Sequence, residues 1–327
     1  MKVKFSKNVL VTGGTGFVGR ALVQRLYHDV KCGLLVAVRY QSQRTRLPAG
    51  VQIVDVGDIG SNTSWSRALK NISVVIHTVA RAHVMNETIE DPLKEYRRVN
   101  VSATLNLAQQ AAEAGIRRFI YISSIKVNGE STVTGHLFTP EDVPAPIDPY
   151  GISKLEAEIG LRKISEETGL EVVIIRPPLV YGPNTAGNFN RLLRVVASGM
   201  PIPLGAIQNQ RSLVSLDNLV DLIVVCIDHP AAANQIFLAG DGEDISTPEL
   251  LKRLGAALDK PVRLISLPEP ILTFGANILG KRAMAQRLCG SLQVDISKTR
   301  HLLGWNPPLS VDEGLEKTAR AFLSDKN

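Results

Sequence analysis

Short, continuously apolar runs alternate with helical patterns along the first half of the chain, and this alternation restricts the possible folds more than any other feature. Strands that are apolar throughout are buried on both faces, as they are in a parallel sheet with helices on each side. Because crossovers between parallel strands are right-handed, the alternation predicts an α/β fold with a doubly wound, Rossmann-type parallel sheet. The predicted strands are residues 8–12, 34–38, 51–55, 74–77, 119–123 and 172–176.

The regular alternation ends after Arg176, where prolines and glycines separate shorter elements. Ligands of doubly wound folds bind at the carboxyl edge of the sheet, and we expect the later part of the chain to form a smaller C-terminal substrate cap there. The predicted dinucleotide-binding domain is residues 1–180 and 212–240, and the predicted cap is residues 181–211 and 241–327. Helices are predicted at residues 17–27, 92–114, 150–168, 217–227, 248–258 and 270–285, with a late strand at 235–239.

The first predicted strand runs directly into a glycine-rich turn, Gly13-Gly14-Thr15-Gly16-Phe17-Val18-Gly19. Gly13 allows a tight turn, Gly16 lets the backbone approach a pyrophosphate, and Gly19 lets the following helix pack close to the strand. Phe17 and Val18 open that helix, whose free N–H groups and dipole favour an anion. A glycine turn without a ligand is the alternative, but the strand before it and the helix after it favour a dinucleotide site.

The second predicted strand is followed by Arg39, where a dinucleotide site usually has an acidic residue that binds a ribose hydroxyl. A guanidinium at this position suits a 2′-phosphate, so the sequence predicts NADP, with NAD as the alternative. Arg44 and Arg46 could add to the same pocket or could be solvated side chains of a loop. Asp58 and Ile59, after the third strand, are predicted to lie beside the adenine, although Asp58 could instead cap a helix.

Tyr150 and Lys154 lie four residues apart at the start of a predicted helix, so both side chains share one face. A phenol has a pKa near 10, and we expect the lysine to lower the pKa of Tyr150 towards the catalytic range. Ser124 ends the fifth predicted strand and could join the pair. Such a pair is often a surface feature, but its occurrence together with Ser124 and the glycine-rich turn favours a catalytic role.

Together these motifs resemble the extended short-chain dehydrogenases/reductases, the NAD-dependent epimerase/dehydratase family. The run Arg176-Pro-Pro-Leu-Val-Tyr-Gly-Pro183 and the late Asp295-Ile-Ser-Lys298 also resemble this family. The chain most resembles nucleotide-sugar 4-epimerases and, through residues 124–129, UDP-sugar 4-ketoreductases of surface-polysaccharide synthesis. The resemblance implies that Tyr150 is the acid/base at a sugar oxygen, that Ser124 binds the same oxygen, and that Lys154 holds the nicotinamide ribose.

The same resemblance implies further site residues. Ala80 would line the cofactor groove, Asn188 would border the nucleobase, and Arg211 and Arg287 would clamp the diphosphate of a UDP-sugar; each substrate residue could instead be an ordinary surface residue. His77 is more typical of a structural strand end than of a proton donor, and Asn100 could support the site or simply bond within its helix. Two positions depart from the family pattern: Leu179 replaces an asparagine that contacts substrate, and Lys126 adds a charge beside Ser124.

Two functions are compatible with these residues. The leading hypothesis is an NADP(H)-dependent reductase of the C4 ketone of a UDP-4-keto-6-deoxy-hexosamine, with Tyr150 as proton donor. The alternative is a redox-neutral 4-epimerase of UDP-hexose or UDP-N-acetylhexosamine with retained NAD. A protein that only senses the cofactor is a third hypothesis, which the joint presence of Tyr150, Lys154 and Ser124 disfavours.

Charge and cysteine content exclude other classes. The formal net charge is +6, but the lysines and arginines are scattered, so a nucleic-acid partner is not expected. The three cysteines are far apart, which argues against a disulfide framework or a metal site and favours the cytoplasm. The apolar run before Gly13 is too short for a signal peptide, and no apolar stretch is long enough for a membrane span.

The family resemblance also implies a homodimer. The predicted helices 92–114 and 150–168 resemble those that build a four-helix interface in this family. The apolar contacts would be Leu93, Val101, Leu105 and Ala108, although these side chains could instead face the sheet.

Overall fold

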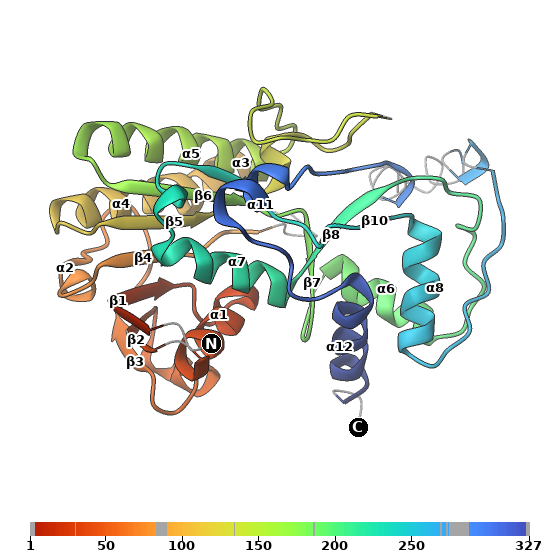
Figure 1. Ribbon diagram of the computed structural model, residues 1–327, viewed down its shortest axis with the longest axis horizontal. Coiled ribbons are helices and arrows are strands. Elements are labelled where there is room, and N and C mark those ends of the chain that lie inside the picture. Colours follow the sequence, from red (N-terminus) through yellow and green to blue (C-terminus); the bar gives the residue numbers. More distant parts are fainter. Residues whose placement is uncertain are drawn as a thin grey trace.

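The computed structural model describes residues 4–29, 31–82, 90–133, 135–185, 187–268, 270–272, 274 and 288–324. Across these ranges, seven strands form one fully parallel sheet in the order β3-β2-β1-β4-β5-β6-β9 (Figure 1). This doubly wound arrangement confirms the predicted fold class. The strands are β1 (Lys4–Thr12), β2 (Lys31–Val38), β3 (Gln52–Asp55), β4 (Val74–His77), β5 (Arg118–Ile122), β6 (Glu171–Arg176) and β9 (Ile236–Leu238).

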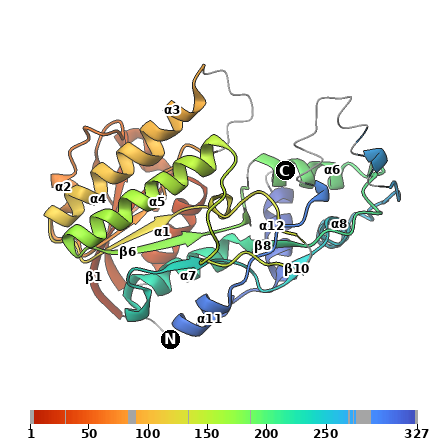
Figure 2. The ribbon, with the colours of Figure 1, turned by 90° about the horizontal axis from the view of Figure 1, so that it is seen from above.

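Helices cover both faces of this sheet (Figure 2). One face packs against α1 (Phe17–Asp29) and α7 (Leu216–Asp228), and the other against α2 (Ser66–Leu69), α4 (Ala103–Glu113) and α5 (Pro149–Thr168). Because successive side chains of a strand point to opposite faces, Val9 and Val11 join the first core while Leu10 joins the second. Burial on both faces explains why the strands are apolar throughout.

A second, smaller sheet lies at the carboxyl side of the large one. Among the described residues it has three strands, β7 (Leu179–Tyr181), β8 (Arg211–Ser215) and β10 (Asp244–Ile245), in the order β10-β8-β7. The helices α6 (Gly187–Ala197), α8 (Thr247–Ala257) and α12 (Val311–Ser324) pack with it into a separate core. α11 (Ser297–Leu303) returns to the large sheet and packs against β9.

Strand β8 belongs to both lobes, which the predicted domain boundaries do not anticipate. Leu213 lies in the core of the smaller lobe, whereas the next residue, Val214, lies in the core of the large sheet. The prediction assigns residues 212–240 to the dinucleotide-binding domain, yet β8 pairs with β7 and β10. The exact division of the chain into two domains therefore stays a prediction.

The predicted helix 92–114 is interrupted. It begins as α3 (Pro92–Tyr96), passes through a π-helical segment, η2 (Arg97–Ser102), and continues as α4. Single π-helical turns often occur at functional sites, and this one contains the buried Asn100. The predicted elements 217–227, 235–239 and 248–258 correspond to α7, β9 and α8. The predicted helix 270–285 lies almost entirely outside the described residues.

Candidate active site

The glycine-rich turn joins β1 to α1 with very little space between the two elements. Gly13 has a φ of +75°, which favours glycine, and a Cβ there would lie 2.6 Å from Thr78 Oγ1. A Cβ on Gly19 would lie 2.1 Å from the carbonyl oxygen of Gly13. The hydroxyl of Thr78 itself donates to Thr12 O at 2.8 Å, so β4 holds the turn from the other side.

Gly16 is less crowded than the other two glycines. Among the described residues, a Cβ at Gly16 would meet only Gly13 O, at 3.2 Å. Its own N–H donates to Gly13 O at 2.9 Å. The first turn of α1 reads Phe17-Val18-Gly19-Arg20 and carries no carboxylate that would repel an anion. The turn thus fits the pyrophosphate of a dinucleotide.

Arg39 lies immediately after β2 and is exposed. Its backbone N–H donates to Gln43 Oε1 at 3.2 Å, and Arg44 and Arg46 follow on the short helix η1 (Gln41–Arg46). The Tyr40 phenol donates to Asp58 Oδ1 at 3.2 Å. Asp58 does not cap a helix, since α2 begins only at Ser66 with Trp65 at its N-cap. Ile59, next to Asp58, packs partly buried against the second sheet core.

The structure brings Tyr150, Ser124 and Lys154 together. Ser124 follows the end of β5 and caps the short helix η3 (Ile125–Val127), and its hydroxyl is near enough to the Tyr150 phenol to lower the pKa of that phenol. Lys154 is buried one helical turn after Tyr150, and its Nζ donates to Ile122 O at 2.7 Å. The same Nζ lies 4.5 Å from the ring centroid of Tyr121 and 5.9 Å from that of Tyr150. The three residues thus form one compact group at the carboxyl end of β5.

The pKa of Tyr150 is raised overall, whereas the sequence predicts that Lys154 lowers it; the effect of Lys154 itself stays a prediction. Burial raises the pKa of Tyr150 to about 12, and this outweighs the lowering effect of the hydrogen bond from Ser124. Burial also lowers the pKa of Lys154 to about 7, although the carboxylate of Glu158 opposes that shift. Desolvation disfavours the charged form of both groups, so the lysine offers less positive charge to the phenol than its position in the sequence suggests.

Sequence reasoning missed a buried ion pair beneath this group. Arg176 Nη2 donates to Glu158 Oε2 at 2.6 Å, and both side chains are 1% exposed. Arg176 also donates to Asn128 Oδ1 at 2.9 Å, while the hydroxyl of Ser123 donates to Glu158. The signal was present, because Glu158 follows Lys154 by four residues on the same face of α5.

Two further predicted residues have structural partners. His77 is buried between Thr12 Oγ1, 2.7 Å from Nδ1, and Thr104 Oγ1, 3.0 Å from Nε2. Asn100 binds the backbone of Arg81 through both side-chain atoms and donates to Ser153 Oγ at 2.9 Å. Ala80 is half-buried a few residues beyond β4, which ends at His77. Tyr96, which the sequence did not suggest, places its ring edge-on at 6.1 Å from the ring of Tyr150.

The predicted substrate residues are less closely grouped. Arg211 opens β8, is half-buried and donates from Nη1 to Gly290 O at 2.9 Å. Asn188 is exposed in the first turn of α6. Arg287 lies outside the described residues, so its position relative to Arg211 stays a prediction. Leu179, whose correspondence to an asparagine of the family stays a prediction, is 41% exposed on β7.

Two features are absent from the described part of the chain. No helix there combines the length and the apolar character needed to cross a membrane. Within the same residues, no three histidine, cysteine or acidic side chains come together as a metal site would require.

Comparison with known proteins adds independent evidence. Residues 9–240 match the model of the NAD dependent epimerase/dehydratase family. The chain is 49% identical to a UDP-glucose 4-epimerase of Vibrio cholerae, over 99% of this chain and 98% of the relative. It is 26% identical to the N-acetyl-alpha-D-glucosaminyl-diphospho-ditrans,octacis-undecaprenol 4-epimerase of Escherichia coli O157:H7, over 95% and 94% of the two chains.

A solved structure shares the fold. The UDP-glucuronic acid 4-epimerase of Bacillus cereus in complex with NAD superposes with a TM-score of 0.78 at 22% identity, covering 99% of this chain and 100% of that one. The family match covers well over half of the chain and agrees with the resemblance seen in the motifs. The chain therefore belongs to the NAD dependent epimerase/dehydratase family.

Proposed function

We propose that this protein is a UDP-hexose or UDP-N-acetylhexosamine 4-epimerase that keeps NAD bound between turnovers. The neighbouring Tyr150 and Ser124, with Lys154 beside them, carry this proposal. The 49% identity to the Vibrio cholerae UDP-glucose 4-epimerase over almost the whole chain supports the epimerase over the reductase that the sequence favoured.

In this proposal the chain supplies proton handling and orientation. Tyr150 removes the proton from the sugar C4 hydroxyl and later returns it, while Ser124 holds the same oxygen in place. The ammonium of Lys154 has three donors, and Ile122 O takes one of them, so the others can hold ribose hydroxyls of the cofactor. When bound, NAD supplies the acceptor and donor of the C4 hydride. Arg211 would contact the diphosphate.

The test supplies UDP-glucose and UDP-N-acetylglucosamine separately, with no added reductant, and follows formation of the galacto epimers. We expect efficient interconversion by the unmodified protein. Tyr150→Phe should lower kcat by about 10²–10⁴-fold, as loss of a general acid/base does, while nucleotide binding is retained. Tyr27→Phe, at an exposed tyrosine on α1, is the matched control and should behave like the unmodified protein.

A 4-ketoreductase is the second candidate, and two observations favour it. Arg39 is exposed directly after β2, as an NADPH-dependent enzyme would require, and Leu179 replaces the family's asparagine. A parallel assay therefore offers a UDP-4-keto-6-deoxy-hexosamine with NADPH and follows nucleotide oxidation. Stoichiometric oxidation there, without interconversion of the UDP-hexoses, would replace the epimerase with the reductase.

The cofactor preference is tested on its own. The family is NAD-dependent, whereas Arg39 predicts NADP(H). The nucleotide released from the purified protein should be identified by mass. If Arg39 binds a 2′-phosphate, Arg39→Asp shifts the preference towards NAD by roughly tenfold or more, since a charge-assisted contact contributes about 1.5–3 kcal/mol. Equal kinetics with both cofactors in the unmodified protein would exclude that role.

We also propose a homodimer formed through the face of α5, and the cytoplasm as its compartment. Ile159 on α5 is 59% exposed and offers an apolar contact, whereas Ala108 is fully buried in the chain's own core and cannot contact a partner. Ile159→Lys should convert the light-scattering mass from dimer to monomer, and Ile271→Lys, at an exposed isoleucine of the cap, should not. All three cysteines, which lie among the described residues, are free, and this supports a reducing compartment.

A further inference from the structure

Lys126 connects the two elements that carry the Tyr150–Ser124 pair. It follows Ser124 by two residues on η3, and its ammonium lies between two carboxylates. Nζ donates to Glu130 Oε1 at 2.7 Å and to Asp148 Oδ2. Asp148 is the N-cap of α5, and its other oxygen, Oδ1, accepts the N–H of Gly151 at 2.7 Å. The Asp148 carboxylate thus binds both the first turn of α5, which carries Tyr150, and η3, which follows Ser124.

The backbones of the two elements are also closely packed. A Cβ on Gly151 would lie 2.9 Å from Lys126 O, so the first turn of α5 rests directly on η3. The N–H of Ile125 donates to Pro177 O at 2.9 Å, which fixes the serine turn to the end of β6. The N–H of Lys126 lies 3.3 Å from Ser124 Oγ. The side chain of Lys126 extends from a turn that is already held in place.

Several groups around the Tyr150 phenol influence its charge. Lys154 lies on α5, Tyr121 on β5 and Tyr96 on α3, while Ser124 donates or accepts at the phenol itself. Asp148 is the anion among them, and its charge raises the pKa of Tyr150. The ammonium of Lys126 is in direct contact with that carboxylate.

We propose that Lys126 is a positioning residue for the Tyr150–Ser124 pair, which holds Asp148 in place at the start of α5 and screens its charge from the phenol. The chemistry of this role rests on the proposed epimerase function, but the contacts themselves do not. A direct role of Lys126 in proton transfer is disfavoured, because its ammonium is engaged by two carboxylates.

Four variants test the proposal: Lys126→Met, Lys126→Arg, Asp148→Asn, and the double variant that combines Lys126→Met with Asp148→Asn. Methionine removes the charge at similar length, arginine keeps it, and asparagine keeps the N-cap of α5 without its charge. Lys163→Met, at an exposed ion-paired lysine of α5, is the matched control.

The first measurement is the pH dependence of kcat and KM for UDP-hexose interconversion. With Asp148 no longer screened in Lys126→Met, less phenolate forms at a given pH. We expect kcat at neutral pH to fall about tenfold, with KM nearly unchanged. The pH range over which kcat increases should move upward by about one unit, as it would if the pKa of Tyr150 rose by one unit. Lys126→Arg should stay close to the unmodified protein. Asp148→Asn should move that pH range downward, and adding Lys126→Met to it should change nothing further.

The second measurement needs no substrate. The tyrosinate absorbance of the purified holoprotein is titrated, with Tyr150→Phe subtracted, and should shift in the same directions as the pH range over which kcat increases. If no UDP-hexose is converted by the unmodified protein, the proposed function fails and this titration alone decides the role of Lys126. The role is overturned if Asp148→Asn leaves the Tyr150 titration unchanged, or if Lys126→Met has the same effect with and without Asp148→Asn.

Discussion

At the scale of single residues, burial decides the protonation of the side chains beneath the site. Lys154, His77 and Glu158 are all fully or almost fully buried, and each has close polar partners. The ion pair of Glu158 with Arg176 keeps a charged carboxylate in the core, because unpaired it would be costly. His77 has no charged partner of that kind and is bonded to two hydroxyls, so burial lowers its pKa from 6.5 to about 3 and it stays neutral.

The state of His77 predicts how stability depends on pH. The unfolded chain binds a proton at this histidine below its ordinary pKa of 6.5, whereas the folded chain does so only near 3. The unfolded state therefore binds more protons between these values, and the free energy of unfolding falls as the pH falls. From pH 7 to pH 5 this single group should cost about 2 kcal/mol.

Urea unfolding at the two pH values measures this cost. His77→Gln should show a shallower loss between pH 7 and pH 5 than the unmodified protein. His301→Gln, at an exposed histidine of α11, should leave the slope unchanged. An equal slope in His77→Gln and the unmodified protein would contradict a neutral, buried His77.

At the scale of elements, the glycines of the turn between β1 and α1 have two different roles: close packing within the protein and close approach of a ligand. Gly19 has no room for a side chain because the Gly13 carbonyl oxygen would lie 2.1 Å from its Cβ, whereas at Gly16 the same oxygen would lie 3.2 Å away, a tight but smaller conflict. Packing therefore accounts for Gly19, and the approach of a ligand is the better account of Gly16.

Two alanine variants distinguish packing from binding at this turn. Gly19→Ala should lower the free energy of unfolding by about 1–3 kcal/mol, as overpacking does, and should weaken nucleotide binding as a consequence. Gly16→Ala should lower the free energy of unfolding by less than Gly19→Ala does and still weaken NAD binding. Chemical denaturation and isothermal titration of nucleotide measure the two effects. Normal NAD affinity in Gly16→Ala would show that the dinucleotide does not approach the backbone there.

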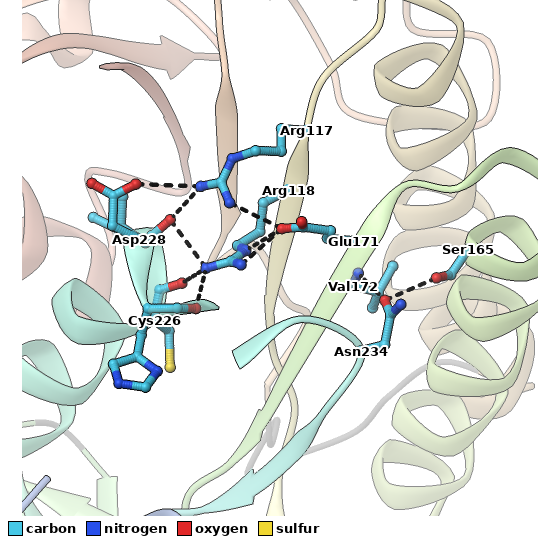
Figure 3. Close-up of polar contacts among 10 residues, drawn as sticks. Arg117, Arg118, Ser165, Glu171, Val172, Cys226, Asp228 and Asn234 are labelled. Atoms are coloured by element: carbon cyan, nitrogen blue, oxygen red, sulfur yellow. Dashed lines mark hydrogen bonds and ion pairs between the residues drawn. The ribbon is translucent and has the colours of Figure 1, made fainter. Parts of the chain in front are cut away.

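A second element-scale feature is the arginine cluster at the opposite edge of the sheet, where β5 and β6 begin. Figure 3 shows the guanidinium of Arg118 between the end of α7 and Glu171. It donates to the carbonyls of Cys226 and His229 at 2.7 and 3.0 Å and to Glu171 Oε2 at 2.8 Å. The last carbonyls of a helix need partners, and here a fully buried arginine from a neighbouring strand supplies them.

Removing this arginine should be costly. Arg118→Met leaves buried carbonyls without this donor and is expected to lower the free energy of unfolding by about 1–3 kcal/mol for each carbonyl left unsatisfied. The matched control is Arg320→Met, at an exposed ion pair on α12, which should cause no measurable change. Urea denaturation compares both variants; similar midpoints for the two would refute the capping role of Arg118.

At the scale of the whole molecule, a buried polar junction joins the sheet to the smaller lobe. The side chain of Asn218 on α7 donates to Asp241 Oδ1 at 2.7 Å and to Leu309 O at 2.8 Å, and accepts the N–H of Leu309. The Tyr181 phenol on β7 donates to the other oxygen of Asp241 at 2.8 Å. Helix α7 and strand β7 therefore meet at the Asp241 carboxylate, and Asn218 of α7 also binds the segment before α12.

This junction predicts cooperative unfolding of the two lobes. Trp65 and Trp305 both lie in cores of the large sheet, so tryptophan fluorescence follows the unfolding of that lobe. Far-UV circular dichroism also follows the helices of the smaller lobe, and in urea the two signals should report coincident transitions. With Asn218→Ala added, part of the circular dichroism change should precede the fluorescence change, because the hydrogen bonds to Leu309 are lost. Coincidence in the variant would mean that other contacts couple the lobes.

The sequence by itself determined the sheet, the glycine-rich turn and the spacing of Tyr150 and Lys154. These features are local, because each is encoded within about ten neighbouring residues. They are a strand that is apolar throughout, a turn that needs glycine, and two residues one helical turn apart. The match to the family model covers residues 9–240 and so includes both the glycine-rich turn and the Tyr150–Lys154 pair. The interrupted helix at residues 97–102 was missed, because its π-helical turn holds Asn100 against Arg81 and Ser153, which are distant in sequence.

Tertiary structure alone decided the electrostatics and the connections. The sequence placed a lysine beside a tyrosine, but only packing shows that burial raises the pKa of Tyr150 and lowers that of Lys154. It likewise placed Lys126 near Ser124, yet the contact with Asp148 spans 22 residues. Desolvation depends on every atom packed around a group, and long-range contacts depend on how separate elements dock. Neither quantity is a property of a short stretch of chain, so spacing and residue type could not determine them.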